Sequence, residues 1–388
     1  MVAMTRYSFG IAVVATILPS VWCAMVNLPI HFRNSYASVE VDIGTPPQAH
    51  FLHFDTGSSS TWVVDQKCAT TCPNGSGYVR KGYNISASST GTPLGTYGSI
   101  DYFGGKTAGP GVADTFSLLA GTQGHAALTW NQTFLAANET SWRFISADGF
   151  LGLAFSTIAV ANTTTVVETL MQQGHLDEPQ FAIYYGKEFE NTSTNPEGVF
   201  TIGGSKEEQY VDGDLTYVPL AQEKEYQVWR ATLSSITGST NAGKKQATSK
   251  FEGGRAVFDT GAGALQVPSN AISEIYASIG MNWTAISQGG HIPMCSDFNS
   301  SWSVTFNFGE SETDPKLTLT GDQLAQPGFA DRKDACNPPF DDSGSEDFAL
   351  LGTPLLQQFY TVWDFGATEV ADYHPRIGFG KLKAGVRP

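Results

Sequence analysis

The sequence predicts an all-β fold built from two related lobes, and three observations lead to this prediction. Residues 39–43 and 303–308 alternate apolar and polar side chains with the period of two that is typical of a half-buried strand. The 41 glycines are spread along the chain, as many tight turns between short strands require. Residues 54–57 and 258–261 have the same sequence, Phe-Asp-Thr-Gly, which indicates a duplication.

The duplication continues beyond this tetrapeptide. Each copy follows an apolar run, which in the first case is residues 50–54. Each copy is also followed, at nearly the same distance, by two apolar residues and a glycine, at residues 150–152 and 350–352. A repeat of this length indicates a duplicated lobe rather than a solenoid unit, whose period is about 20–50 residues.

Helical patterns are few and short. We expect helices only at residues 165–173, 271–279 and 354–359. Residues 237–250 are polar and are predicted to form an exposed loop.

The predicted boundary between the lobes lies near residues 203–208, where a glycine pair is followed by charged residues. We therefore expect an N-terminal lobe over residues 36–205 and a C-terminal lobe over residues 206–388. A short segment, residues 25–35, precedes the first lobe.

The charge balance excludes some partners. Asp and Glu number 37 against 22 Lys and Arg, and the formal net charge is −15. Nucleic acids and anionic membranes attract clustered Lys and Arg, so neither is an expected partner. An acidic compartment suits such a chain, because protonation of many of these acids lowers its self-repulsion.

The N-terminus has the features of a secretory signal. One basic residue, Arg6, precedes the apolar residues 11–18, a run that is too short to span a bilayer. We expect residues 1–24 to be the signal peptide and the protein to be secreted or to enter an acidic lumen of the secretory pathway. The C-terminus lacks the hydrophobic tail of a lipid-anchor signal, so no membrane anchor is expected.

The cysteines and the glycosylation sequons agree with export. Outside the signal four cysteines remain, and an even number in an exported chain indicates disulfides. Of the three possible connectivities we expect Cys68–Cys72 and Cys295–Cys336, one in each lobe. A zinc site is not expected, because the two pairs lie in different halves and no histidine spacing supports it. N-glycans are expected at eight sequons, which are Asn74, Asn84, Asn131, Asn138, Asn162, Asn191, Asn282 and Asn299.

The two Asp-Thr-Gly segments predict a pair of carboxyl groups in one site. Each aspartate ends an apolar strand, and the glycine that follows lets backbone N–H groups approach the carboxylate. When two such loops face each other, both acids cannot ionise at once, so the pair holds one proton. One carboxylate then serves as general base for a water molecule while the protonated partner donates to a carbonyl oxygen. This chemistry requires no metal, cofactor or covalent intermediate.

With these motifs the chain resembles the pepsin-like aspartic endopeptidases. The resemblance extends from about Tyr36 to Gly380. Beyond the Asp-Thr-Gly segments it includes residues 62–64, 100–105, 114–115, 148–153, 348–353, 358–364 and 377–380. It implies a bilobal all-β fold of two barrel-like lobes with a central cleft, polypeptide substrates in that cleft and a monomeric protein.

The resemblance also implies roles for individual residues. Asp55 and Asp259 correspond to the catalytic pair, and Thr56 and Thr260 to the side chains that tie the two loops together. Supporting donors to the carboxylates would be the backbone N–H groups of Gly57 and Gly261 and the hydroxyl of Ser58.

A mobile hairpin that closes over the substrate is implied at residues 100–105. Tyr102 lies on this flap, and Trp62 is its expected hydrogen-bond partner. Phe103 stands at the flap tip, next to Gly104, where the family usually has a small residue. It either lines the cleft or fills space.

Two departures from the family pattern bear on pH. Ala262 stands where Ser or Thr is usual, so Asp259 lacks a hydroxyl donor and its pKa is expected to be higher. Thr353 stands where Asp is usual, which removes a negative charge and acts in the opposite direction. We expect the donor loss to dominate, because it acts by direct contact, and the pH optimum to be mildly acidic.

Two further departures concern His53 and the N-terminus. Period-two alternation places His53 on the same side of its strand as Asp55. It is either a packed neutral histidine or a protonated imidazole that favours the anionic pair. Residues 25–35 offer only His31 and Arg33 as cations, so we expect no self-inhibiting basic pro-segment.

Two other functions remain as alternatives. The first is a catalytically inactive relative that serves as a binding or inhibitor protein. Such relatives usually lack an aspartate of the pair, a loop glycine or the flap tyrosine, all of which are present here. The departures at Ala262 and Phe103 keep this alternative open. The second is a secreted carbohydrate-binding module, which accounts for the sequons but not for the paired loops.

Overall fold

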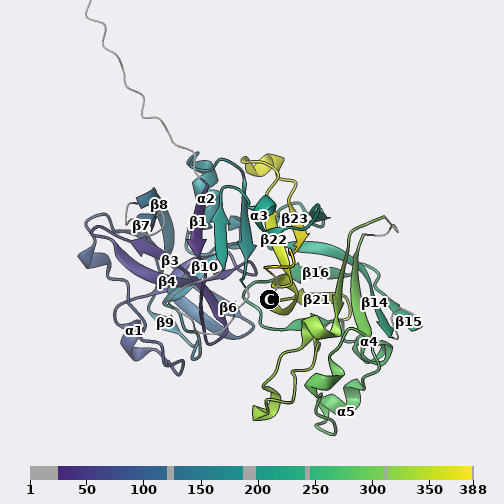
Figure 1. The fold of residues 1–388 in the computed structure, drawn as a ribbon. Helices are drawn as coiled ribbons and strands as arrows, with labels where there is room; N and C mark the ends of the chain where they lie inside the picture. The colour runs from purple at the N-terminus through teal and green to yellow at the C-terminus, as the bar shows by residue number, and fades with distance from the viewer. Residues whose placement is uncertain are drawn as a thin grey trace, which may run out of the picture.

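A computed structural model describes residues 25–119, 126–186, 198–240, 245–309, 311 and 313–386. The expected signal peptide and the sequon Asn191 lie outside the described residues. The described chain is mostly β-strand with a few short helices, and its strands form three sheets. In Figure 1 the strands from the first half of the chain gather on one side, and the green strands from the second half lie on the other. The predicted bilobal all-β fold is confirmed.

The first sheet lies entirely within the first half of the chain. Its strands follow the order β2 (His31–Arg33), β3 (Tyr36–Ile43), β4 (Gln48–Asp55), β10 (Gly149–Gly152), β5 (Trp62–Val64), β8 (Ala126–Ala137), β7 (Gly105–Leu119) and β6 (Thr92–Tyr102), with β9 (Glu139–Thr140) paired to β7.

The second sheet lies within the second half of the chain. Its strands follow the order β19 (Lys316–Thr320), β18 (Trp302–Phe308), β14 (Arg230–Thr240), β16 (Arg255–Phe258), β21 (Phe348–Leu351), β17 (Leu265–Val267) and β20 (Asp341–Asp342), with β15 (Lys245–Lys250) paired to β14.

The third sheet joins the two halves. Its strands follow the order β1 (Val26–Pro29), β12 (Val199–Ile202), β11 (Gln180–Tyr184), β22 (Phe359–Asp364), β23 (Arg376–Lys381) and β13 (Thr216–Pro219). The yellow strand β22 therefore lies beside β11 from the first half, near the middle of Figure 1.

Both halves repeat one arrangement around an Asp-Thr-Gly segment. In the first half β10 pairs in parallel with β4, and Gly152 stands opposite Asp55. In the second half β21 pairs in parallel with β16, and Leu351 stands opposite Phe258. An antiparallel strand flanks each pair, β5 in one half and β17 in the other. The duplication seen in the sequence is therefore a duplication of structure.

The alternating segments form strands with the expected faces. In β3 the side chains of Val39, Val41 and Ile43 are buried, whereas Glu40 and Asp42 between them are partly exposed. β18 alternates buried and partly buried positions along its whole length. These patterns follow from the opposite directions of successive side chains in a pleated strand.

The prediction of an exposed loop over residues 237–250 is wrong. Most of this segment belongs to a hairpin of β14 and β15. Its Thr and Ser residues are polar, but β-branched threonine favours strands, and the Thr237 and Thr248 hydroxyls lie 2.9 Å apart across the hairpin. Ser249 also donates a hydrogen bond to Glu274 of α4 (Ile272–Ser278), which packs against both strands.

The predicted helices are present with small differences. They are α2 (Val166–Gln172), α4 and α6 (Thr353–Leu356). α6 is shorter than predicted, because Phe359 already begins β22. The sequence analysis missed three other short helices, which are α1 (Cys68–Thr71), α3 (Glu207–Tyr210) and α5 (Trp283–Ser287). None of the described helices is long and apolar enough to cross a membrane.

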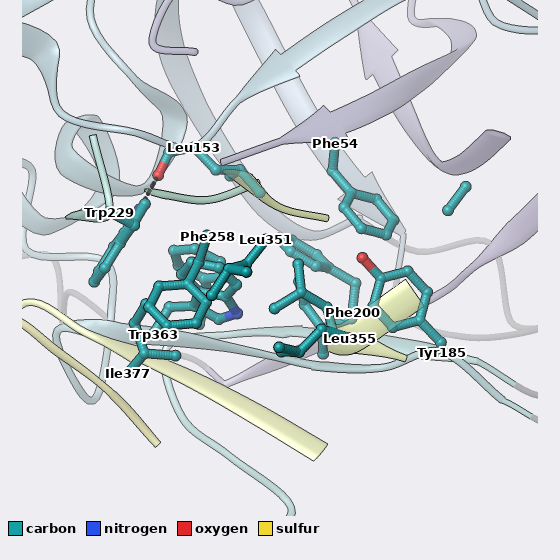
Figure 2. Close-up of a cluster of buried hydrophobic side chains, with 14 of the residues drawn as sticks. Phe54, Leu153, Tyr185, Phe200, Trp229, Phe258, Leu351, Leu355, Trp363 and Ile377 are labelled. Carbon is teal, nitrogen blue, oxygen red and sulfur yellow. Dashed lines mark hydrogen bonds between the residues drawn. The ribbon is translucent and has the colours of Figure 1, made fainter. Parts of the chain in front are cut away.

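One hydrophobic core connects all three sheets. Phe54 and Phe258, the residues that immediately precede the two aspartates, are fully buried in it. Figure 2 shows them among side chains from both halves, including Trp229 and Trp363. The Trp229 indole N–H donates to the carbonyl oxygen of Leu153 at 2.8 Å. The strands that carry the aspartates are thus anchored in a shared core.

Two disulfides are present in the described chain, and each has one fully buried cysteine, Cys68 in one and Cys336 in the other. They join Cys68 to Cys72 and Cys295 to Cys336, which confirms the expected pairing.

Candidate active site

The structure brings the two Asp-Thr-Gly segments together. Asp55 is the last residue of β4, and Asp259 directly follows β16. Asp259 shares a side-chain hydrogen bond with Asp55, although the two residues come from different halves of the chain. A Cβ atom on Gly57 would lie 2.5 Å from the Asp259 carboxyl group, and one on Gly261 would lie 2.6 Å from an Asp55 oxygen. Only glycine allows the two loops to approach this closely.

Thr56 and Thr260 hold the loops together by reciprocal hydrogen bonds. The backbone N–H of each threonine donates to the hydroxyl of the other, at 3.0 and 2.9 Å. Each hydroxyl in turn donates across the interface, from Thr56 to the carbonyl of Phe258 and from Thr260 to the carbonyl of Phe54. Both side chains are buried, so all of these groups are removed from water.

Replacing Thr260 with valine is expected to lower the free energy of unfolding by roughly 2–4 kcal/mol, because the buried N–H of Thr56 and carbonyl of Phe54 lose their partners. Chemical denaturation of the purified variant measures this loss. Thr216→Val, at an exposed position of β13, is the matched control and should change stability by less than about 0.5 kcal/mol. Equal stability of both variants would show that the hydrogen bonds between Thr56 and Thr260 do not stabilise the fold.

The two carboxyl groups have unequal hydrogen-bond partners. Asp55 accepts from the N–H of Gly57 at 2.9 Å and from the hydroxyl of Ser58 at 2.5 Å. Asp259 accepts from the N–H of Gly261 at 2.7 Å, and Ala262, at the position equivalent to Ser58, has no hydroxyl to add. The charged form of Asp259 therefore lacks a donor that Asp55 has.

The pKa of Asp259 lies well above its ordinary value. Burial of its carboxyl group is the largest cause, followed by the charge of Asp55 and the hydrogen bond between the two side chains. The backbone N–H groups of Gly261 and Gly57 oppose this rise but do not cancel it. Its surroundings therefore favour the protonated form of the Asp259 carboxyl group.

The predicted flap is a hairpin of β6 and β7. The indole N–H of Trp62 donates to the Tyr102 hydroxyl at 3.0 Å, as the sequence analysis expected. At the turn, Gly104 lies so close to the Trp142 ring that a Cβ would stand 2.6 Å from it. Phe103 is 92% exposed, so it does not fill space in the protein interior.

A cavity of about 1250 Å³ lies beside the Asp259 loop. Its lining includes Thr260, Gly261 and Ala262 from that loop and His53 and Phe150 from the first half. Polar side chains line another part, among them Gln323, Gln357 and Gln358. The cavity is thus framed by both halves of the chain.

His53 faces this cavity and lies near Asp55, as strand alternation predicted. It is only 4% exposed, and its Nδ1 atom lies 2.6 Å from the carbonyl oxygen of Ala37. Burial lowers the pKa of His53, and the smaller opposing effects of the Ala37 carbonyl and the Asp55 charge do not reverse this. The structure therefore favours the packed, neutral histidine of the two interpretations.

Comparison with known proteins agrees with this geometry. A model of the eukaryotic aspartyl protease family matches residues 35–372. The chain belongs to the eukaryotic aspartyl protease family. It is 29% identical over 347 residues to a probable vacuolar protease A of Trichophyton verrucosum, which covers 87% of this chain and 78% of the relative. It is 30% identical over 342 residues to pepsin II-1 of Oryctolagus cuniculus, which covers 85% of this chain and 78% of the relative.

Membership of the aspartyl protease family makes this chain an aspartic-type hydrolase. The two departures from the family pattern near Asp259, at Thr353 and Ala262, are joined by hydrogen bonds in the structure. Thr353 donates from both its backbone N–H and its hydroxyl to the carbonyl oxygen of Ala262, at 2.8 and 3.2 Å. This threonine therefore fixes the Asp259 loop where the family usually has an acid.

The sequence analysis of this aspartyl protease gave no site role to several aromatic residues that line the cavity, among them Trp142, Phe150 and Tyr185. Phe150 lies within a motif that was recognised, but no local pattern shows that Trp142 meets the flap. The only indication of this contact in the sequence is that Trp142 is a large aromatic residue in the polar segment before Asp148.

No metal site accompanies the dyad in the part of the chain that the structure describes. No group of three or more His, Cys, Asp or Glu side chains lies close enough there to hold a metal ion.

Proposed function

We propose that this protein is an exported aspartic endopeptidase that cleaves polypeptides at mildly acidic pH. The observation that carries the proposal is the contact between the Asp55 and Asp259 carboxyl groups across the two halves of the chain. Its lobes are proposed to span residues 36–205 and 206–388. The cavity beside the dyad provides room for an extended peptide.

The unequal environments of the two acids suggest their roles. Asp259 carries the shared proton and donates it to the oxygen of the scissile carbonyl, while Asp55 takes a proton from the attacking water. Water adds to the carbonyl carbon and forms a tetrahedral gem-diol. Asp55 then protonates the amide nitrogen, Asp259 recovers its proton from the gem-diol, and the C–N bond breaks. Tyr102 on the flap is proposed to cover the bound peptide.

The pH–rate profile should place its alkaline limb well above pH 3.8, the ordinary pKa of the Asp259 carboxyl. Activity requires protonated Asp259, so it is lost as the pH rises through the raised pKa of this group. Ala262→Ser adds a donor that stabilises the charged form, and it should move the alkaline limb down by about 0.5–1 pH unit. The measurement is kcat/KM across pH for both proteins.

The control for that experiment is Ala277→Ser, which makes the same change at an exposed position of α4. It should leave the limb in place. A limb that does not move in Ala262→Ser, or an optimum well below that of a typical pepsin, would contradict the proposed role of the missing hydroxyl.

The endopeptidase activity is tested by digestion of an unfolded protein substrate at pH 3–6 with and without a statine-type inhibitor. The tetrahedral hydroxyl of such an inhibitor mimics the transition state and should bind far more tightly than a substrate. Internal cleavage that the inhibitor blocks supports the proposal. Binding of the inhibitor without any cleavage would instead support the alternative of an inactive binding protein.

Export and glycosylation are part of the same proposal. Six of the sequon asparagines are exposed, which are Asn74, Asn131, Asn138, Asn162, Asn282 and Asn299, and Asn84 is partly buried. Glycans attached at the exposed positions meet no steric obstacle from the core. Mass spectrometry of the secreted protein before and after N-glycanase treatment tests this directly.

A further inference from the structure

A buried histidine of the first half lies beside a buried aspartate. His50 of β4 and Asp148, the residue before β10, are 1% and 0% exposed. Nδ1 of His50 lies 3.8 Å from Oδ2 of Asp148, which is too far for a hydrogen bond. Among the described residues, neither ring nitrogen of His50 has a hydrogen-bond partner. A protonated ring has two N–H donors, so protonation of His50 would create donors with no acceptor within hydrogen-bond distance.

The Asp148 carboxylate is already occupied by other donors. Its Oδ2 accepts from the backbone N–H of Phe51 at 2.9 Å, and its Oδ1 accepts from the N–H of Lys81 at 2.6 Å and the Tyr78 hydroxyl at 3.1 Å. The N–H of Asp148 also donates to the Phe51 carbonyl at 2.8 Å. If the carboxylate moved toward a charged His50 ring, these hydrogen bonds would lengthen or break.

The same hydrogen bonds support the strands of the candidate active site. Phe51 lies in β4, the strand that ends at Asp55, and Asp148 directly precedes β10. β10 pairs in parallel with β4 and places Gly152 opposite Asp55. The contacts of Asp148 therefore fix one end of a strand pair whose other end holds a catalytic carboxyl group.

The surrounding charges do not favour a charged His50. The other titratable and charged groups around the pair are His31 and Arg33 of β2, Glu40 and Asp42 of β3, His53 of β4, and Tyr78, Arg80 and Lys81 of the segment 78–81. Lys81 repels a protonated His50 ring. Val41 stands opposite His50, and successive side chains of a strand alternate, so Glu40 and Asp42 point to the other face of the sheet. Asp148 is therefore the acid that faces the ring.

Burial lowers the pKa of His50 from its ordinary value of 6.5 to about 4, with the Lys81 charge acting in the same direction and the Lys81 backbone opposing both. Between these two pH values the ring is neutral in the folded protein and charged in the unfolded chain. Stability that is fully present above pH 6.5 is therefore lost as the pH falls to about 4.

Asp148 acts in the opposite direction. Burial raises the pKa of its carboxyl group, so the folded protein takes up this proton more readily than the unfolded chain does. The N–H groups of Lys81 and Phe51 and the Tyr78 hydroxyl limit this rise. We therefore expect the effect of His50 to dominate.

We propose that His50 is an acid-sensitive switch, whose protonation draws Asp148 away from Phe51 and Lys81, loosens β4 and β10, and inactivates the protein below the pH at which it works. The switch goes beyond the proposed endopeptidase function, and folding stability reports on it without any assay of activity. Because the neutral ring makes no hydrogen bond, an apolar side chain of similar size should replace it without leaving a polar group of the protein unpaired.

The test is denaturant unfolding of the wild-type protein and of His50→Leu from pH 7.5 to pH 3.5. Between pH 6.5 and 4 the wild-type protein should take up about one proton more on unfolding than the variant, which appears as a steeper loss of unfolding free energy as the pH falls. The midpoint of acid unfolding, followed by circular dichroism, should lie about 0.5–1 pH unit lower in His50→Leu.

The matched control is His291→Leu, the same substitution at an exposed histidine outside this cluster. It should leave the pH dependence and the midpoint unchanged. Each protein is compared with itself at different pH values, so a general loss of stability does not alter the result. If leucine is not accommodated, His50→Met repeats the test with a more adaptable apolar side chain.

The outcomes separate this proposal from the proposed function. Equal pH dependence and equal midpoints in the wild-type protein and His50→Leu overturn the switch, and so does an equal shift in His291→Leu. A wild-type unfolding free energy that stays constant between pH 6.5 and 4 also overturns it. All of these results leave the endopeptidase function standing, whereas a protein that shows the expected pH dependence of folding but cleaves no polypeptide overturns that function alone.

Discussion

Replacing either Asp55 or Asp259 with asparagine is expected to lower kcat by at least about 10³- to 10⁴-fold, because general acid–base catalysis is lost. The two carboxyl groups share one proton, and an amide can neither take a proton from water nor give one to the carbonyl oxygen. The amide has nearly the shape of the carboxyl group, so the hydrogen bonds from Gly57 and Gly261 constrain the variants in the same place. The measurement is single-turnover cleavage of a peptide, with circular dichroism to verify the fold.

The control is Asp214→Asn, the same change at an exposed aspartate. It should retain wild-type kcat within about twofold, as is usual for surface substitutions. Substantial residual activity in either dyad variant would show that the paired acids are not the catalytic groups. Loss of activity in the control would show that catalysis responds to the loss of any one negative charge and not to the dyad in particular.

Replacing Trp229 with alanine is expected to lower the free energy of unfolding by about 3–5 kcal/mol, the usual cost of deleting a large buried aromatic side chain. Trp229 is fully buried, and its ring packs edge to face against Trp363 at 5.2 Å and close to Phe155 at 5.0 Å. Its N–H also binds the Leu153 carbonyl, just after the strand that supports Asp55 (Figure 2). Removal therefore leaves a cavity between the halves and an unpaired carbonyl.

Denaturant unfolding measures this loss of stability. Two further variants show how much of it comes from the buried ring and how much from the N–H group. Trp229→Phe keeps most of the ring and removes the N–H, so it should cost about 1–3 kcal/mol. Phe103→Ala removes an aromatic ring that is 92% exposed and should cost less than about 0.5 kcal/mol. If Trp229→Ala were no more harmful than Phe103→Ala, the core of Figure 2 would not connect the two halves as described.

Much of the site could be predicted from sequence because its residues lie in short local motifs. Phe54 and Phe258 end apolar runs, and each places the next residue, an aspartate, at the mouth of its loop. The hydrogen bond between Ser58 and Asp55 spans three residues, so the spacing alone brings the groups together. The repeated tetrapeptide indicated that two such loops would meet.

The missed features depend on contacts between distant segments. Trp142 becomes part of the cavity lining only because the flap turn, far earlier in the chain, packs against it. β1 and β12 pair with each other although they lie far apart in sequence, and the third sheet also takes strands from the second half. The hairpin of β14 and β15 was read as a loop because hydroxyl side chains are common to loops and to strands that pack through threonine pairs.

For His53 the sequence predicts the position of the side chain but not its protonation state. Strand alternation correctly placed its side chain on the side of Asp55, since that depends only on the backbone period. Its protonation state depends on burial and on the Ala37 carbonyl of the neighbouring strand, neither of which the local sequence reveals.

The most direct test of the central claim is a crystal structure of the protein with a statine-type inhibitor. The account predicts that the inhibitor's hydroxyl oxygen lies within about 2.5–3.2 Å of carboxyl oxygens from both Asp55 and Asp259. A hydroxyl that contacts one aspartate alone, or an inhibitor bound away from the two loops, would contradict a mechanism in which both acids act on one water molecule.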